Sequence, residues 1–384
     1  MTELITSLKI EGFRAFRELS IPTFGKVNLI TGKNNTGKTS LLEAIRILVS
    51  RGSAEVIREI LASREEEVGV SDLKRDVAGA SFEAYRSIFT GFPDLTARAV
   101  TLSMVATGAL PQPVGSLSMA ARQAIRKLDA SSQLVGYELL APDQMVMDDP
   151  DGIPALEIRM GDEGPGRVIS LYGSRIFTQA MANRPGAPFV EKVRSIDHLY
   201  VDPFTSRVTA QLGDLWDEVA LTDLQPEILH ALQIVAPEIE GISMIGWAQS
   251  GTRVRKAIVR SQAFPQPVTL RTFGDGVVRL FGIVLSLCNI RDGILLIDEF
   301  ENGLHYSVQV AVWKTIFRLA RQLNVQVFGT SHSWDCVRAF SEAAADSPAD
   351  GVLIRLTRVG DKVIPATFTE SDLKVVTEYD IEVR

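Results

Sequence analysis

Gly32-Lys33-Asn34-Asn35-Thr36-Gly37-Lys38-Thr39 fits the pattern G-x-x-x-x-G-K-[ST] and decides the fold class of this chain. Residues 27–31 (VNLIT) precede it and are mostly apolar, as expected of a buried strand. The apolar residues that follow fall on one face of a helix: Leu41, Leu42, Ile45, Leu48 and Val49. A strand, a glycine-rich loop and a helix in this order predict a phosphate-binding P-loop.

The residue types of this loop suit a nucleoside triphosphate. Gly32 and Gly37 allow the tight turn that aims backbone N–H groups at phosphate, and the helix that follows adds its positive end. Lys38 would reach the β and γ phosphates, and the Thr39 hydroxyl would ligate Mg²⁺. Asn35 tolerates a left-handed backbone better than most residues. The predicted nucleotide-binding residues are Gly32, Lys33, Asn34, Asn35, Thr36, Gly37, Lys38, Thr39 and Ser40.

Length and composition narrow the class of protein. A chain of 384 residues can hold one nucleotide-binding domain with a large insertion. The net charge of −7 argues against capture of nucleic acid by the chain as a whole, although a local basic patch would escape this test. The two cysteines form no C-x-x-C pair, which suits a reducing compartment and offers no zinc site. No signal core or membrane-spanning stretch is evident, so we expect a cytoplasmic protein.

The chain divides into three predicted parts. Residues 1–50 form the first part of an ATPase core, residues 51–260 an insertion with antiparallel β and helical elements, and residues 261–384 the second part of the core. The insertion shows helical patterns near 54–61, 82–89, 208–219 and 226–235, and strand-like runs at 99–105, 134–140, 155–159 and 167–171. The predicted fold class is therefore α/β, with a parallel core sheet, an antiparallel β subdomain and a helical insertion.

The second part of the core supplies a carboxylate pair. Residues 293–297 (GILLI) read as a central parallel strand, and Asp298 and Glu299 follow at its end. Asp298 would hold Mg²⁺ directly or through water, and Glu299 would orient and deprotonate the attacking water. An acidic pair at this position can also simply cap the next helix. The upstream Lys38 favours the catalytic interpretation.

A third strand, residues 325–329 (VQVFG), ends in Thr330-Ser331-His332-Ser333. Ligands of open α/β sheets collect at the carboxyl ends of the strands. His332 would donate a hydrogen bond to the γ phosphate or to the attacking water. The alternative is a histidine with a purely structural partner at a strand end.

Between the insertion and the second core strand lies a further glycine-rich segment, residues 271–276 (RTFGDG), directly before an apolar helix. It forms a second cluster of N–H groups suited to an anion. One triphosphate does not need two such clusters from one subunit, so we expect this segment to face the nucleotide of a second chain. The alternative is a glycine-rich turn before a core helix.

These segments together resemble the heads of ABC-type ATPases. Residues 32–39, 272–276, 298–299 followed by Glu301-Asn302-Gly303-Leu304-His305, and 330–333 occur in the order of that family, and 8–16 (LKIEGFRAF) is similar to its first strand. The resemblance is strongest to the bacterial AAA15 and OLD ATPases, relatives of RecF, Rad50 and SMC heads. It implies a signature motif of Thr272, Gly274 and Gly276 acting on a partner's nucleotide. It further implies a D-loop at 301–305, a switch histidine at His332, and a phosphate contact from Arg14.

The chain also departs from the family pattern. Thr272 replaces the signature serine, Asp275 places a negative charge beside it, and no glutamine between Thr39 and Gln112 can serve as a Q-loop. The stretch after His332 is too short for the TOPRIM nuclease domain of OLD proteins.

The resemblance implies an Mg²⁺-dependent ATPase that forms a homodimer or higher homo-oligomer around ATP. It would regulate a separate effector, such as a nuclease, in bacterial anti-phage defence. One alternative is a RecF-like repair ATPase that binds DNA through Arg253, Arg255, Lys256 and Arg260, although these lie on alternating faces of a strand. A second alternative is a GTPase, since a P-loop reads phosphates and not the base.

Overall fold

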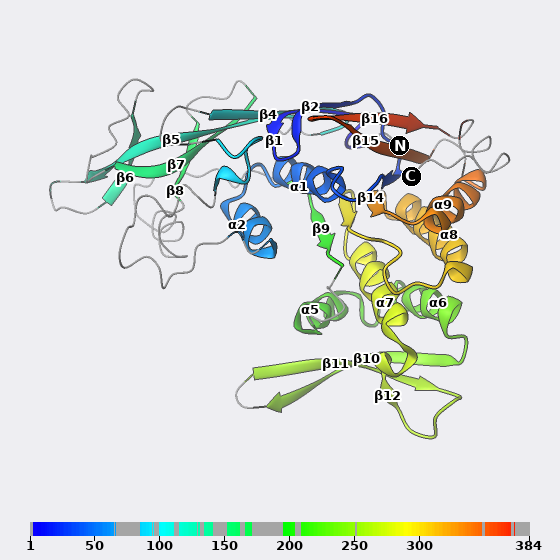
Figure 1. Cartoon of the computed structure of the whole chain (residues 1–384). Helices are drawn as coiled ribbons and strands as arrows, with labels where there is room; N and C mark the ends of the chain where they lie inside the picture. Colours follow the sequence, from blue (N-terminus) through cyan, green and yellow to red (C-terminus); the bar gives the residue numbers. More distant parts are fainter. Residues whose placement is uncertain are drawn as a thin grey trace.

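The computed structural model describes residues 3–64, 66, 85–93, 95, 100–110, 115–128, 130, 134–140, 152–161, 166–170, 195–203, 209–249, 252–347, 350–369 and 372. The described chain builds three sheets and the helices that cover them (Figure 1).

The central sheet runs in the order β16-β15-β3-β14-β13-β9 and is parallel except at β16, which pairs antiparallel with β15. Its strands are β3 (Val27–Thr31), β9 (His198–Val201), β13 (Ile294–Ile297), β14 (Gln326–Ser331), β15 (Gly351–Val359) and β16 (Lys362–Phe368). Every residue of β3, β13 and β14 is buried, as the apolar runs predict for strands covered on both faces.

Helices cover both faces of this sheet. On one face, α1 (Lys38–Val49) shares a core with Ile30, Leu296 and Phe328. On the other face, α7 (Asp275–Cys288), α8 (Tyr306–Gln322) and α9 (Trp334–Ala345) share a core with Leu29 and Ile297. The alternation of Ile30 with Leu29 and of Leu296 with Ile297 follows the period of two of a strand. The carboxyl ends of β3, β13 and β14 consequently meet beside the first turn of α1.

The second sheet is antiparallel and combines the N-terminal hairpin with strands of the predicted insertion. Its order is β2-β1-β4-β5-β7-β8, with β6 paired to β5. The strands are β1 (Ser7–Phe13), β2 (Phe16–Ile21), β4 (Val100–Thr107), β5 (Ser116–Leu128), β6 (Leu134–Leu139), β7 (Gly152–Met160) and β8 (Arg167–Ser170). Side chains of β1, β2, β4, β5 and β7 pack in one core with α1 and α2 (Ala54–Ser63), so this sheet extends directly from the nucleotide-binding helix.

The third sheet lies at the other end of the molecule (Figure 1). Strands β10 (Ile239–Gln249), β11 (Thr252–Ser261) and β12 (Val268–Thr269) pack with α5 (Thr209–Val219), α6 (Gln225–Val235) and the 3₁₀ turn η3 (Leu270–Phe273). Arg255 of β11 fixes this sheet to α5, because its guanidinium donates to both carboxylate oxygens of Asp217 and to the Gly213 carbonyl at 2.5, 2.6 and 2.8 Å.

Two findings bear on the predicted organisation. The parallel core, the antiparallel sheet and the helical pair at 209–235 are present as expected. Strand β9, however, lies within the stretch 51–260 that we predicted as an insertion, yet it pairs with β13 in the core sheet. This strand was not among the predicted strands. The domain boundaries 1–50, 51–260 and 261–384 stay a prediction. None of the described helices is long and apolar enough to cross a membrane.

Candidate nucleotide site

The loop between β3 and α1 has the backbone that its glycines permit. Gly32, Asn35 and Gly37 have φ angles of 148, 63 and 93°. A Cβ on Gly32 would lie 2.4 Å from the Leu356 carbonyl oxygen, and one on Gly37 would lie 2.8 Å from the Phe16 ring. Both positions therefore require glycine for backbone conformation and for space.

The inside of this loop offers donors to an anion. Gly37 is the N-cap of α1 and supplies no side-chain cap, so the first N–H groups of the helix remain for a ligand. The Lys38 ammonium lies over the loop and donates to the carbonyls of Gly32 and Lys33 at 2.7 and 3.1 Å. Burial lowers the pKa of Lys38, and nearby carboxylates act in the opposite direction. The Lys33 carbonyl also accepts a hydrogen bond from the Thr36 hydroxyl at 2.9 Å, which is a bond within the loop itself.

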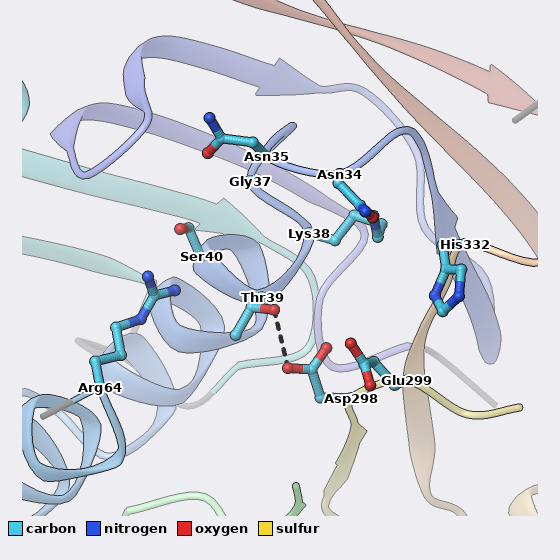
Figure 2. A pocket seen from close by; sticks show the side chains of 10 residues that line it. All are labelled: Asn34, Asn35, Gly37, Lys38, Thr39, Ser40, Arg64, Asp298, Glu299 and His332. Atoms are coloured by element: carbon cyan, nitrogen blue, oxygen red, sulfur yellow. Dashed lines mark hydrogen bonds between the residues drawn. The ribbon is translucent and has the colours of Figure 1, made fainter. Parts of the chain in front are cut away.

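A pocket of about 270 Å³ opens at this loop. Figure 2 shows how its side chains converge from α1, the ends of β13 and β14, and the end of α2. The lining residues are Asn34, Asn35, Gly37, Lys38, Thr39, Ser40, Arg64, Asp298, Glu299 and His332. The structure thus brings the predicted P-loop, carboxylate pair and histidine together in one pocket.

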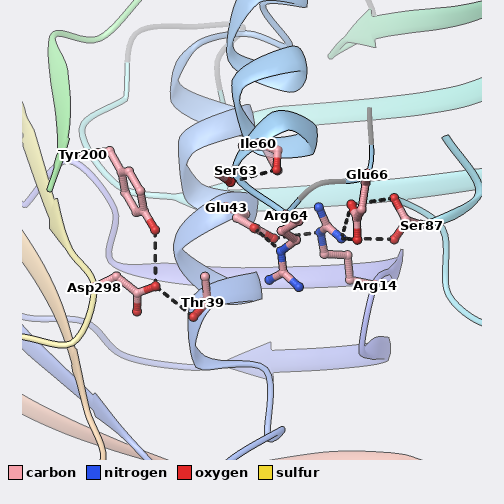
Figure 3. Close-up of polar contacts among 10 residues, drawn as sticks. All are labelled: Arg14, Thr39, Glu43, Ile60, Ser63, Arg64, Glu66, Ser87, Tyr200 and Asp298. Atoms are coloured by element: carbon pink, nitrogen blue, oxygen red, sulfur yellow. Dashed lines mark hydrogen bonds and ion pairs between the residues drawn. The ribbon is translucent and has the colours of Figure 1, made fainter. Parts of the chain in front are cut away.

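Asp298 is the centre of a network of hydroxyl groups (Figure 3). Its Oδ2 accepts from Thr39 Oγ1 at 2.9 Å and from the Tyr200 hydroxyl at 3.2 Å, and its Oδ1 accepts from Thr330 Oγ1. Burial and the Asp298 carboxylate raise the pKa of Tyr200, so this phenol stays a donor. A carboxylate and an aliphatic hydroxyl 2.9 Å apart at the floor of a phosphate pocket are the hard oxygen ligands that Mg²⁺ prefers.

Glu299 lies one residue beyond, in a left-handed backbone with φ of 48°. Such a conformation is strained for a residue with a Cβ and persists only when its surroundings hold it. Here the Glu299 N–H donates to Thr330 Oγ1 at 2.9 Å, and Arg279 Nη2 donates to the carbonyls of Asp298 and Glu299 at 2.5 and 3.3 Å. The turn directs the Glu299 side chain into the pocket (Figure 2).

His332 follows β14 and has an exposed ring (56%) at the rim of the pocket. Its backbone N–H and its Nδ1 both lie against Glu301 Oε1, at 2.9 and 3.1 Å. Glu301 belongs to the predicted D-loop, so the histidine and the D-loop are joined within one chain. The other ring nitrogen remains for a ligand.

The predicted signature residues lie elsewhere. Thr272 and Gly274 are exposed at the start of α7, and no signature residue lines the described P-loop pocket. Gly276 packs against the D-loop: a Cβ there would lie 2.2 Å from the Gly303 carbonyl oxygen. Arg271 Nε lies 3.6 Å from Asp275 Oδ1, and its positive charge reduces the repulsion between Asp275 and an approaching phosphate.

The predicted phosphate contact from Arg14 stays a prediction, and in the structure this side chain pairs with two carboxylates. The Arg14 side chain is only 5% exposed and pairs with Glu43 at 2.7 Å and with Glu66 at 3.2 Å (Figure 3). Glu43 also accepts from Arg64 Nε at 2.7 Å, and it is Arg64 that lines the pocket. The reason is the left-handed turn at Arg14 (φ 45°) between β1 and β2, which directs its side chain toward α1.

Sequence reasoning missed two residues at this site, Arg64 and Tyr200. Arg64 is a single arginine after α2 with no motif around it, and Tyr200 lies on a strand of four residues. The sequence contains no motif that would identify Arg64 or Tyr200 as part of the site.

The chain is similar in sequence to several known proteins. A family model described as AAA ATPase domain (AAA_15) matches residues 4–78 and 249–337. A protein named ATP/GTP phosphatase from Helicobacter pylori is 24% identical over 387 residues, which cover 98% of each chain. The DNA replication and repair protein RecF of Idiomarina loihiensis is 50% identical over 44 residues, 12% of each chain.

A crystal structure of an Smc head bound to the C-winged-helix domain of ScpA has the same fold. Its TM-score is 0.51 at 11% identity, covering 96% of this chain and 98% of that one. The predicted fold class, a P-loop head of the ABC type, is confirmed.

Proposed function

We propose that this chain, an AAA15-type ATPase related to the SMC and RecF ATPases, hydrolyses ATP between two subunits and thereby controls its own assembly. The observation that carries the proposal is the division of the site. The P-loop, the carboxylate pair and His332 share one pocket, whereas Thr272 and Gly274 are exposed outside it.

Mg²⁺ would be held by the Thr39 hydroxyl and the Asp298 carboxylate, which the structure places in contact. When bound, the ion neutralises charge on the β and γ phosphates. Lys38, now bonded to loop carbonyls, would exchange these acceptors for phosphate oxygens. Its partial burial makes that exchange favourable, because a triphosphate is a better partner for a desolvated ammonium than neutral carbonyls are.

The hydrolytic step falls to groups on the pocket rim. Glu299 would accept a proton from the attacking water, and His332 would donate a hydrogen bond to the γ phosphate. Arg64 adds a fixed positive charge at the same pocket, held in place by Glu43. Charge developing on the transferred phosphoryl group would thus meet cations already in position.

The second subunit would supply the remaining donors. The N-terminus of α7 begins at Asp275 with Gly274 as an uncapped N-cap, so its N–H groups can meet the phosphates of a partner's ATP. Gly276 packs on Gly303, so the signature segment and the D-loop form one surface. This surface would close on the partner when ATP is bound and release after hydrolysis.

The proposal is tested with Glu299→Gln, which keeps the shape of the side chain and removes the base. We expect this variant to bind ATP with Mg²⁺, hydrolyse it at least about 100-fold more slowly, and accumulate as an oligomer in multi-angle light scattering. Glu342→Gln on the exposed side of α9 is the matched control and should behave as wild type. An unchanged mass of Glu299→Gln with and without ATP would refute assembly on ATP. Competition between ATP and GTP in the same assay shows whether the site prefers adenine or guanine nucleotides.

We further propose that the assembled form regulates a separate effector, such as a nuclease, in bacterial antiviral defence. This part rests on the family resemblance. The described residues contain no group of three or more His, Cys, Asp or Glu side chains that could hold a metal ion for a second activity. If the proposal is right, Glu299→Gln should co-purify with the product of an adjacent gene in ATP and not without it. Absence of any ATP-dependent partner would contradict it.

Two of the four basic residues that motivated the RecF-like alternative have carboxylate partners in the structure. Arg255 is held by Asp217 and Gly213, and Arg260 pairs with Glu240 at 3.2 Å. Each of these two cations would have to exchange its carboxylate partner for a phosphate in order to bind a DNA backbone.

A further inference from the structure

Tyr200 comes from a part of the chain that none of the nucleotide-binding motifs includes. It lies on β9, the edge strand next to β13, where it is paired in register with Leu296. Its hydroxyl donates to Asp298 Oδ2 at 3.2 Å, the same oxygen that accepts from Thr39. Figure 3 shows both hydrogen bonds, with the Asp298 carboxylate joined to the Tyr200 hydroxyl on one side and to Thr39 on the other.

Both the ring and the main chain of Tyr200 are held in place. The Arg46 guanidinium of α1 lies 5.0 Å from the ring centroid, and Arg46 is itself paired with Glu59 of α2. The main chain is fixed as well, because the Asp298 N–H donates to the Val201 carbonyl at 2.9 Å. The distance from the phenol to the carboxylate is therefore set by the sheet and by α1.

From this contact we infer that Tyr200 is a positioning residue for the magnesium site, which keeps Asp298 Oδ2 turned toward the metal bound beside Thr39. The inference rests on the proposed role of Thr39 and Asp298 as the metal-holding pair.

The two oxygens of the Asp298 carboxylate are held by donors from different strands. Thr330 holds Oδ1 of Asp298 from the direction of β14. Tyr200 holds Oδ2 from the direction of β9. With both oxygens held, the Asp298 carboxylate cannot rotate about its Cβ–Cγ bond. Without the phenol, Oδ2 would keep only the Thr39 hydroxyl, whose oxygen must also face the cation. Hydrogen bonds to a ligand from outside the metal shell orient it in this way and raise metal affinity.

The test is Tyr200→Phe, which removes one hydroxyl and keeps the ring under Arg46. Mn²⁺ serves as the probe, titrated into protein saturated with the non-hydrolysable analogue AMP-PNP and followed by the EPR signal of the free ion. We expect the Kd for Mn²⁺ to rise about tenfold, the lower end of the effect of losing such a partner. Binding of AMP-PNP in EDTA and the melting temperature should stay as in wild type. The kcat at saturating metal should recover most of the wild-type value.

Tyr306→Phe is the matched control, because Tyr306 is an exposed phenol at the start of α8 and should not affect Mn²⁺ binding. An unchanged Kd for Mn²⁺ in Tyr200→Phe would overturn the inference. So would an equal loss of AMP-PNP binding in EDTA, since it would assign the phenol a general structural role. If wild type itself binds AMP-PNP equally well with Mg²⁺ and with EDTA, the metal site of the proposed function fails instead.

Discussion

Arg279 offers the sharpest test of how the hydrolytic residues are held. It lies on α7, the helix that begins with the signature segment, and it is only 3% exposed. Its guanidinium donates to the carbonyls of Asp202, Asp298 and Glu299. One side chain thus ties the ends of β9 and β13 to the signature helix.

The expected cost of Arg279→Met in stability follows from two opposing effects. The two closer hydrogen bonds from the charged donor, to the carbonyls of Asp202 and Asp298, are lost at about 1.5 to 3 kcal/mol each, and the longer one to Glu299 at 3.3 Å adds less. Against this, the variant no longer buries a guanidinium, whose desolvation costs several kcal/mol. Burial lowers the pKa of Arg279, which shows that the site disfavours the charge. The free energy of unfolding should therefore fall by only about 2 kcal/mol.

The effect on catalysis should be larger. Glu299 has a strained backbone, with φ of 48°, and Arg279 is one of its two supports. When that support is lost, the turn can relax and the carboxylate can leave its position. A displacement of about 1 Å at a catalytic group costs on the order of 100-fold in rate, so we expect kcat to fall by about that factor. ATP affinity should change little, because the P-loop makes no described contact with Arg279.

The three quantities are measured on the same samples: kcat by steady-state ATPase kinetics, ATP affinity by nucleotide binding, and the free energy of unfolding by urea denaturation. Arg338→Met on the exposed face of α9 is the control for loss of an arginine, with an expected change in unfolding free energy within about 0.5 kcal/mol. Arg279→Lys should recover part of the stability but little of the rate, since one ammonium cannot reproduce the planar fork. A full kcat in Arg279→Met would refute the argument that this side chain positions Glu299.

Features that depend on residues adjacent in the chain can be predicted from the sequence. The P-loop is a continuous segment whose glycines, Lys38 and Thr39 act through local backbone geometry, so its pattern suffices. The sequence also predicts that the carboxylate pair and His332 lie near the P-loop, because each follows an apolar run that reads as a parallel strand. The ends of such strands share one edge of a sheet, and this topological rule places residues far apart in the chain in the same pocket.

Residues that depend on a contact across the fold could not be predicted. Strand β9 has four residues, too few to show a period, and its partner β13 begins almost a hundred residues later. Tyr200 therefore carried no signal. Arg64 likewise carried no signal, because its place at the pocket depends on a contact across the fold: Arg14 and Arg64 both pair with the buried Glu43 carboxylate of α1, and of the two only Arg64 lines the pocket.

Two further predictions concern the buried cysteines and the contact between Gly276 and the D-loop. Both cysteines should resist thiol reagents in the native state and react in denaturant, because both are buried and burial raises the pKa of Cys288 to about 12; fast labelling of native protein would contradict this. Gly276→Ala should lower the free energy of unfolding of the nucleotide-free protein by about 1 to 3 kcal/mol, because its Cβ would lie 2.2 Å from the Gly303 carbonyl oxygen. It should also impair assembly on ATP, since the D-loop must move to accommodate the methyl group. Gly274→Ala is the matched comparison: nothing lies within 4 Å of its Cβ, but its φ of 97° disfavours a side chain. If Gly276→Ala unfolded like wild type in urea and still failed to assemble, Gly276 would act only on the partner's nucleotide and not through the D-loop of its own chain.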